Sequence, residues 1–360
     1  MAALICTPAL SQETIRVATY HVGLKRDGPG LLLRDILKGD DPQIKAAAQV
    51  ISASNPDIIL LARIDYDFGL QALSAFVRVL ADLGVRYPHM FAVAPNTGVA
   101  TGLDLDGNGY LGDARDAQGY GEFAGQGGMA ILSKYPIATE NVVDFSQLLW
   151  RDMPGATLPE TQNRDQIDPT QRLSSVAHWD VPVNLPDGTI LRLLAYHATT
   201  PVFDGPEDRN GLRNNDETTF WLRYLDGDLS QIPPRETFVI LGDANLDPID
   251  GDGRQQSINS LLNSGYVKDT KPRSNYARDA SIIQGGANAT HRGDPATDTA
   301  DWRDQNGPGN LRVDYVLPSS DLNVIGSGVN WPSSEHRAAM SNERDDGFVG
   351  HGLVWVDITR

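Results

Sequence analysis

Acidic and amide side chains stand where predicted strands end. The stretch VILGDANLDP places Asp243 and Asn245 two positions apart, hence on the same side of an extended segment. The stretch RVDYVLP places Asp314 in a strand that is otherwise apolar, where a buried carboxylate needs partners. One polar residue after a strand usually marks only a turn, but this joint pattern indicates either an active site or a hydrogen-bonded structural network.

Cationic and imidazole groups occupy comparable positions. Arg63 follows the apolar run 58–61, and His21 and His197 each end a predicted strand. A guanidinium can hold phosphate through paired hydrogen bonds. One hypothesis is therefore that Arg63, His21 and His197 bind a small anion, with Asp243 available as a base; the alternative is that Arg63 forms a salt bridge with a neighbouring carboxylate.

A second candidate site lies in the stretch DLDGNGYLGDARD, residues 104–116. Its alternate positions follow the ligand spacing of a calcium loop. The expected donors are Asp104, Asp106, Asn108, the carbonyl of Tyr110 and the Gly112 position. The twelfth position is Arg115, so a bidentate carboxylate would have to come from Asp113, Asp116 or elsewhere. We expect a Ca²⁺ ion that orders the loop; the alternative is an Asp/Gly-rich turn without an ion.

Apolar periodicity predicts the elements that position these residues. Strands are predicted at 14–24, 58–61, 89–96, 128–137, 172–183, 189–198, 237–245, 311–318 and 352–358, and helices at 42–55, 70–84, 215–227 and 255–265. Strands outnumber helices, and no repeat or linker divides the chain. We expect a tail over 1–13 and a single α/β domain over 14–360, with a Gly/Asp-rich insertion at about 95–127.

Composition limits the possible partners. The net charge of −17 disfavours long nucleic acid, since there is no Lys/Arg cluster to offset it, but it allows a small phosphorylated molecule or another anion. Cys6 is the only cysteine, which excludes an intrachain disulfide and a cysteine-based zinc site. No apolar run approaches the ~18 residues of a membrane span. The acidic, lysine-poor composition suits a protein exported to the periplasm or outside of a bacterium.

The chain resembles the endonuclease/exonuclease/phosphatase superfamily, which has the DNase I-like fold. The resemblance spans 14–358 and rests on the order and spacing of its motifs: ATYHVGL, PDIILLARID, GMAILSKYPI, LLAYHATT, LGDANLDP, RVDYVLP and HGLVWVDI. The sequence between these motifs is similar to that of poorly characterised bacterial members. The resemblance implies a four-layer sandwich, two packed mixed sheets flanked by helices, with a metal-dependent phosphoesterase site at one edge.

The resemblance also implies roles for particular residues. In the family a histidine before a threonine-rich turn contacts the phosphate, and a Gly-Asp-x-Asn motif orients the water and the phosphoryl group. His197, Asp243 and Asn245 match these motifs, and Asp314 matches the acid of a later strand. A C-terminal Ser-Asp-His supplies an Asp–His pair in the family.

Two family positions are substituted here. Arg63 stands where the family has its Mg²⁺-binding Glu, and His21 stands where it has an Asn on the first strand. Because an arginine cannot ligate Mg²⁺ and repels it, Mg²⁺ at this position is disfavoured. We expect Arg63 to form a salt bridge with Asp243 or Asp314 and to keep Asp243 ionised and weakly basic.

The C-terminal histidine has two candidates. SEHR contains His336, but the family motif should adjoin the last strand, and His351 directly precedes GLVWVDI. Strand register therefore favours His351. Gly350 precedes it where the family has an Asp, so the carboxylate that orients the histidine is expected to be missing.

These substitutions lead to three functional hypotheses. The first is a phosphoesterase (hydrolase) relative with weak or lost catalysis, a pseudoenzyme that binds an anion. The second is a calcium-stabilised, non-catalytic binding or structural protein. The third is an active phosphoesterase with a displaced metal site formed by Asp65, Asp243 and Asp314.

Overall fold

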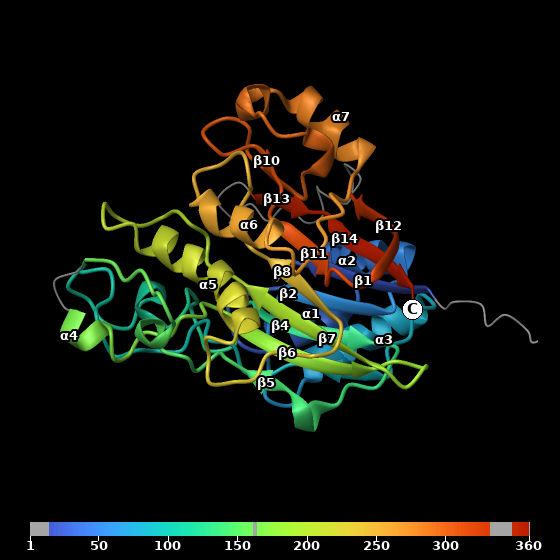
Figure 1. The fold of residues 1–360 in the computed structure, drawn as a ribbon, viewed down its shortest axis with the longest axis horizontal. Helices are drawn as coiled ribbons and strands as arrows, with labels where there is room; N and C mark the ends of the chain where they lie inside the picture. Colours follow the sequence, from blue (N-terminus) through green and yellow to red (C-terminus); the bar gives the residue numbers. More distant parts are fainter. Residues whose placement is uncertain (1–13, 161–163, 332–347, 360) are drawn as a thin grey trace, which may run out of the picture.

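Two β-sheets form the centre of the molecule (Figure 1). The computed structural model describes residues 14–160, 164–331 and 348–359. The larger sheet has the order β12-β14-β1-β2-β4-β3, and a five-stranded sheet has the order β11-β8-β7-β6-β5. A small sheet, β10-β9-β13, completes the described strands.

The larger sheet is mixed. Its strands are β1 (Thr14–His21), β2 (Ile58–Ile64), β3 (His89–Phe91), β4 (Gly128–Ser133), β12 (Asn323–Asn330) and β14 (Leu353–Thr359). β1 runs parallel to β2, whereas its pairing with β14 is antiparallel. β2 has a bulge between Ala62 and Ile64. The extra residue in this bulge is Arg63.

The five-stranded sheet carries Asp243 at the end of one strand and Asp314 at the start of another. Its strands are β5 (Val143–Asp144), β6 (Ala177–Asn184), β7 (Ile190–His197), β8 (Phe238–Asp243) and β11 (Asp314–Pro318). β7 and β8 are parallel, and β11 is antiparallel to β8. The small sheet consists of β9 (Ala300–Trp302), β10 (Asn310–Leu311) and β13 (Phe348–His351).

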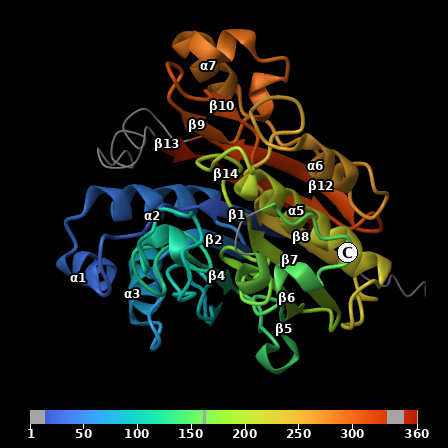
Figure 2. The ribbon, with the colours of Figure 1, turned by 90° about the vertical axis from the view of Figure 1, so that its left-hand side faces the viewer.

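Helices cover the outer faces of the two sheets (Figure 2). The larger sheet packs against α1 (Leu31–Lys38), α2 (Pro42–Ser54) and α3 (Gln71–Asp82), and the five-stranded sheet packs against α5 (Arg209–Asp226) and α6 (Gln255–Leu262). Between the sheets lies a third apolar cluster that includes Val17, Leu60, Trp179 and Leu193. The predicted sandwich of two sheets with outer helices is therefore confirmed.

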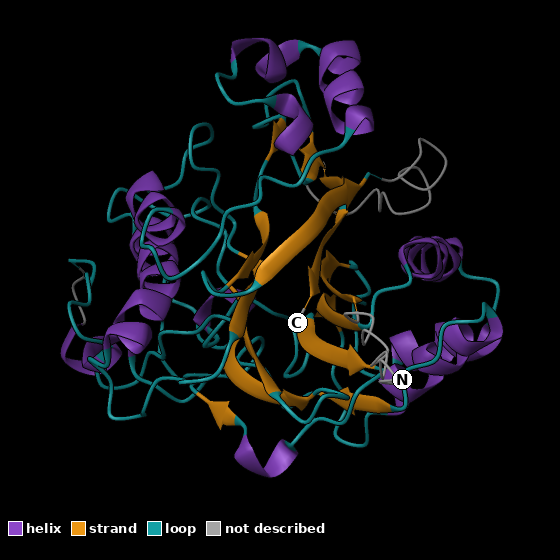
Figure 3. Cartoon of the chain, turned by 45° about the vertical axis from the view of Figure 1, so that its right-hand side comes forward, coloured by secondary structure: helices purple, strands orange, loops and turns teal. Residues whose placement is uncertain are grey.

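Several elements differ from the prediction. α5 begins at Arg209, six residues before the predicted start at 215, and α1, β12, the short α4 (Arg164–Ile167) and α7 (Asn275–Gln284) were not predicted. The segment 95–127 consists of irregular loops with one 3₁₀ turn (Ala114–Asp116). The helices lie at the periphery of the central strands (Figure 3). Among the described residues no helix is long and apolar enough to cross a membrane.

Candidate functional site

The strand ends of both sheets bring the predicted polar residues together. In the five-stranded sheet Asp243 pairs with His197 on one side and with Asp314 on the other, so the three side chains lie in one row. β1 of the facing sheet ends in His21, and β13 ends in His351. This edge of the sandwich is the candidate site.

Two Asp–His contacts and a histidine stack define its geometry. His351 Nδ1 lies 2.6 Å from Asp314 Oδ2, and both side chains are buried. His197 Nε2 lies 3.5 Å from Asp243 Oδ2. The His21 ring stacks on the His351 ring at 4.1 Å and meets the His197 ring edge-on at 5.6 Å.

The Asp314–His351 contact corrects one expectation. An orienting carboxylate was expected to be missing because Gly350 precedes His351. The structure supplies it from β11 instead, 37 residues away along the chain. His336, the alternative histidine, lies outside the described residues.

The turn after β8 is fixed by backbone contacts. A Cβ on Gly242 would lie 1.8 Å from the carbonyl oxygen of Tyr196, so the close approach of β7 requires glycine before Asp243. Asn245 has a φ of 51°; its N–H donates to Asp243 Oδ1 at 2.8 Å, and its side-chain Nδ2 donates to the Ala198 carbonyl at 2.9 Å. Asn245 thus holds the Asp243 carboxylate and the turn after His197 together.

Burial determines most of the protonation states. Burial, then the Asp314 charge, raises the pKa of Asp243 to about 7. Burial, then the positive charges of Arg63 and His351, lowers the pKa of His197 to about 3, and burial also lowers the pKa of His21 well below its usual value. Burial opposes protonation of His351 as well, but the adjacent Asp314 carboxylate outweighs it and raises the His351 pKa. His21 and His197 are therefore neutral at pH 7.

Arg63 does not behave as expected. Among the described residues its guanidinium forms no ion pair with Asp243 or Asp314 and no other ion pair or hydrogen bond. Its positive charge lowers the Asp243 pKa, but burial and Asp314 outweigh it, so the expected weakly basic Asp243 is wrong. Arg63 is half-buried, and its φ of 60° is a left-handed conformation that is rare for arginine.

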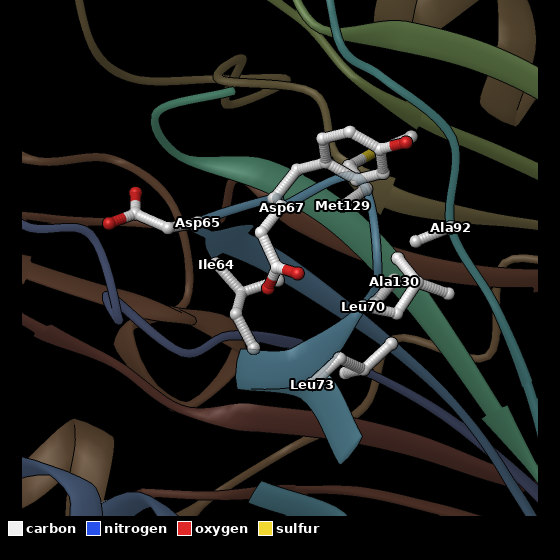
Figure 4. Close-up of a pocket in the computed structure, with 9 residues that line it drawn as sticks. Ile64, Asp65, Asp67, Leu70, Leu73, Ala92, Met129 and Ala130 are labelled. Carbon is white, nitrogen blue, oxygen red and sulfur yellow. The ribbon is translucent and has the colours of Figure 1, made fainter. Parts of the chain in front are cut away.

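Asp65 does not join the site. Its Oδ1 accepts from the Gly127 N–H and its Oδ2 from the Arg26 N–H, both at 2.9 Å. In Figure 4 its carboxylate points away from the narrow pocket beside Leu70 and Leu73. Asp65 therefore fastens loops to the end of β2, and the displaced-metal hypothesis loses one of its three ligands.

The residues present do not fit Mg²⁺. Two groups have ligand atoms within 4.8 Å of one another: His21 with His197 and Asp243, and Asp243 with Asp314 and His351. Both groups include imidazole nitrogens, whereas Mg²⁺ prefers an octahedron of oxygens. The unneutralised charge of Arg63 further opposes a cation. Mixed nitrogen and carboxylate donors suit zinc-class ions better.

The insertion forms the predicted acidic loop. Asp104, Asp106 and Asp116 have carboxylate oxygens within 4.8 Å of one another, and Asp116 is buried. Asn108 Oδ1 accepts from the Tyr110 N–H at 2.7 Å, while Asn108 Nδ2 donates to Asp106 and Asp113. Of the two acids that could replace the missing twelfth ligand, the structure thus brings Asp116 into the group and leaves Asp113 outside it. The Tyr110 ring is exposed, and the Tyr110 carbonyl and the Gly112 position remain predicted donors.

One supporting residue was missed from the sequence. Glu217 of α5 is fully buried and accepts from the Ser175 N–H and hydroxyl and from the Thr199 N–H. It anchors the turn that follows His197. A buried acid on the apolar face of a helix was the signal that could have found it.

Comparisons with known proteins agree with this architecture. The model of the Endonuclease/Exonuclease/phosphatase family matches residues 35–336, and the search of curated proteins finds no significant match. An endonuclease/exonuclease/phosphatase from Beutenbergia cavernae is 18% identical with a TM-score of 0.53, over 96% of this chain and 71% of its own. Sphingomyelinase C from Streptomyces griseocarneus is 16% identical (TM-score 0.47; 96% and 99% covered), and truncated TDP2 from Caenorhabditis elegans is 15% identical (TM-score 0.46; 96% and 98% covered).

The family model covers most of the chain, and the first structure supports the same DNase I-like fold. The chain therefore belongs to the endonuclease/exonuclease/phosphatase family.

Proposed function

We propose that this protein binds the phosphate of a small phosphoester through Arg63 and hydrolyses it weakly or not at all. The observation that carries the proposal is the Arg63 guanidinium, half-buried at the strand ends and without an ion pair or hydrogen bond among the described residues. A partly desolvated cation of this kind is stabilised by an anion that forms paired hydrogen bonds with it.

Neighbouring groups complete an anion site. His21 and His197 are neutral, so each imidazole can donate one N–H to a phosphate oxygen without adding charge. His351, whose pKa is raised by Asp314, adds positive charge behind them. Together these groups offer a phosphate one fixed cation and several hydrogen-bond donors.

Catalysis is limited by what Arg63 cannot do. Asp243, with a pKa of about 7, can accept a proton from water near neutral pH. In-line attack on phosphorus also requires that this water be polarised and that the charge developing in the transition state be stabilised. A metal ion supplies both effects, and its stabilisation of the transition state is worth several kcal/mol. Arg63 can stabilise negative charge on the phosphoryl group but cannot activate the water, so Mg²⁺-stimulated turnover is expected to be near background.

The test separates binding from turnover. Inorganic phosphate should bind in calorimetry, and hydrolysis of bis-p-nitrophenyl phosphate should not rise with added Mg²⁺. Arg63→Glu combined with His21→Asn should restore at most part of the Mg²⁺-dependent activity. Robust Mg²⁺-dependent turnover by the unmodified protein would falsify the proposal.

A second candidate function is favoured by one observation. His21, His197 and Asp243 have ligand atoms within 4.8 Å of one another, a donor set for a zinc-class ion. When bound, such an ion would lower the pKa of a bound water and so supply a nucleophile. Hydrolysis that depends on Zn²⁺ or Mn²⁺ but not on Mg²⁺ would favour this candidate.

We also propose that the 104–116 loop binds Ca²⁺ as a structural ion. Support comes from the close carboxylates of Asp104, Asp106 and Asp116 together with the ligand spacing of the sequence. Such an ion would stabilise the insertion rather than act on the phosphoester. Export would suit this role, because Ca²⁺ is abundant outside a bacterial cell.

A further inference from the structure

A second cavity lies on the α7 side of the molecule, outside the group of strand-end residues. It has a volume of about 240 Å³ and is formed by α7, the 3₁₀ turns Gly286–Thr290 and Pro295–Thr297, and the loop after β8. At about 30 Å³ per water this volume equals roughly eight water molecules. The cavity is therefore large enough for a small organic molecule.

Asp298 lines this cavity with a carboxylate that lacks a partner. The residue is 7% exposed, and among the described residues its side chain makes no hydrogen bond or ion pair. Asp250, the other acid in the lining, differs because its oxygens accept from the N–H groups of Arg292 and Gly293. A buried carboxylate without a partner is costly unless a cation or donor reaches it.

The surroundings of Asp298 are negative. The residues that line the cavity include the two carboxylates Asp250 and Asp298, one histidine, His291, and neither lysine nor arginine. Burial, followed by the charges of Asp247, Asp250, Asp294 and Asp301, raises the pKa of Asp298 to about 9. This potential disfavours anions and favours a cation that would take the place of the proton.

The walls favour an organic cation over a metal ion. Among the described residues, the groups whose acids and histidines lie close enough to hold a metal do not include Asp298. The cavity instead combines the apolar side chains of Ile282, Ala289 and Pro295 with the polar side chains of Ser281, Asn288 and His291. Apolar walls with a few convergent polar groups are typical of small-molecule sites.

We propose that this cavity binds a small organic ammonium ion, held by the Asp298 carboxylate and by the apolar walls around its alkyl group. The cavity adjoins the strand-end site, because Thr299, the residue after Asp298, accepts the N–H of Asp314 at its hydroxyl. The proposal nevertheless stands apart from the proposed function, since it involves neither Arg63 nor the histidines.

Calorimetric titration tests the proposal. The titrants are ethylammonium chloride, tetramethylammonium chloride and CaCl₂, each at matched ionic strength. The unmodified protein should bind at least one ammonium saturably. Asp298→Asn should weaken that binding at least tenfold (about 1.4 kcal/mol). Asp279→Asn is the matched control, because Asp279 is exposed on α7 outside the cavity lining and should bind as the unmodified protein does.

A blocking variant guards against misfolding of Asp298→Asn. Ala289 is exposed at the cavity wall, so Ala289→Trp should fill the space and remove ammonium binding without changing the melting temperature. Equal ammonium affinity in Asp298→Asn or Ala289→Trp overturns the proposal, as does an absence of saturable binding. Asp298-dependent binding of Ca²⁺ without ammonium binding overturns the choice of ligand. Arg63→Gly should keep full ammonium affinity, so this proposal and that of the phosphate site can fail separately.

Discussion

Replacing Arg63 by glycine should stabilise the protein while it weakens phosphate binding. The φ of Arg63 is 60°, a left-handed conformation that costs an L-residue about 1–2 kcal/mol and costs glycine little. The greater freedom of glycine in the unfolded chain offsets about 0.4–1 kcal/mol of this gain. We expect a net gain of about 1 kcal/mol, or about 1 °C in Tm at about 2.1 cal/mol/K per residue over 360 residues.

An electrostatic effect on Asp243 opposes this gain in stability and determines the pH at which stability should be measured. His351 and Arg63 both lower the pKa of Asp243, so removing Arg63 leaves Asp243 and Asp314 with one nearby positive charge fewer. Because the Asp243 pKa is about 7, this carboxyl is largely protonated at about pH 5.5, where the repulsion is small. Urea unfolding at that pH therefore isolates the relief of backbone strain.

Phosphate binding should change in the opposite direction. A hydrogen bond to a charged group contributes about 1.5–3 kcal/mol. Arg63→Gly should therefore raise the Kd for phosphate about 10- to 150-fold at neutral pH, as measured by calorimetry. Lys271→Gly is the matched control, because Lys271 is a cationic residue that also has a positive φ, 46°, and is exposed. This variant should gain stability but keep its phosphate affinity. Unchanged phosphate affinity in Arg63→Gly, or a loss of stability at pH 5.5, refutes the reasoning.

Two further predictions concern calcium and the buried Asp–His pair. Chelation should lower the melting temperature, and Asp104→Ala with Asp106→Ala should remove that response; identical melting curves with and without chelator would count against a calcium site. Because Asp314 raises the His351 pKa, their contact stabilises the fold fully below the unfolded histidine pKa of about 6.5 and loses this effect as pH rises through the folded value. Asp314→Asn should therefore cost about 3 kcal/mol at about pH 5.5 and less at high pH in guanidinium unfolding; a cost independent of pH would contradict this assignment.

Buried strands were predictable because their apolar runs are continuous. α5 shows where this signal ends: its first turns contain Arg213 and Asn214, which look like loop residues yet are buried. Arg213 donates to the carbonyls of Leu173 and Gln118, and Asn214 donates to those of Thr199 and Ala244. Polar side chains that satisfy distant backbone groups carry no periodic signal, so the helix start could not be located from the sequence.

The site was predictable as a set of residues and less so as a set of contacts. Register explained why His351 and Asp314 reach one edge, but their pairing depends on how β13 and β11 approach each other in space. The expected Arg63 ion pairs failed for a related reason. Opposite charges at neighbouring strand ends do not fix a distance, and the bulge in β2 sets the course of the Arg63 side chain.

Charge at the strand ends gives the substitution of Arg63 a physical meaning. By the family resemblance, a glutamate and Mg²⁺ together contribute a net charge of +1 at this position, and Arg63 contributes the same charge without an ion. Under the proposed function the attraction for phosphate is thereby kept, and Asp243 and Asp314 still have a cation nearby. The ability to acidify a water molecule is not kept, because a guanidinium has no open coordination position. Under the proposed function, a site with the electrostatics of a phosphoesterase but without its Lewis acid binds a phosphate and does not turn it over efficiently.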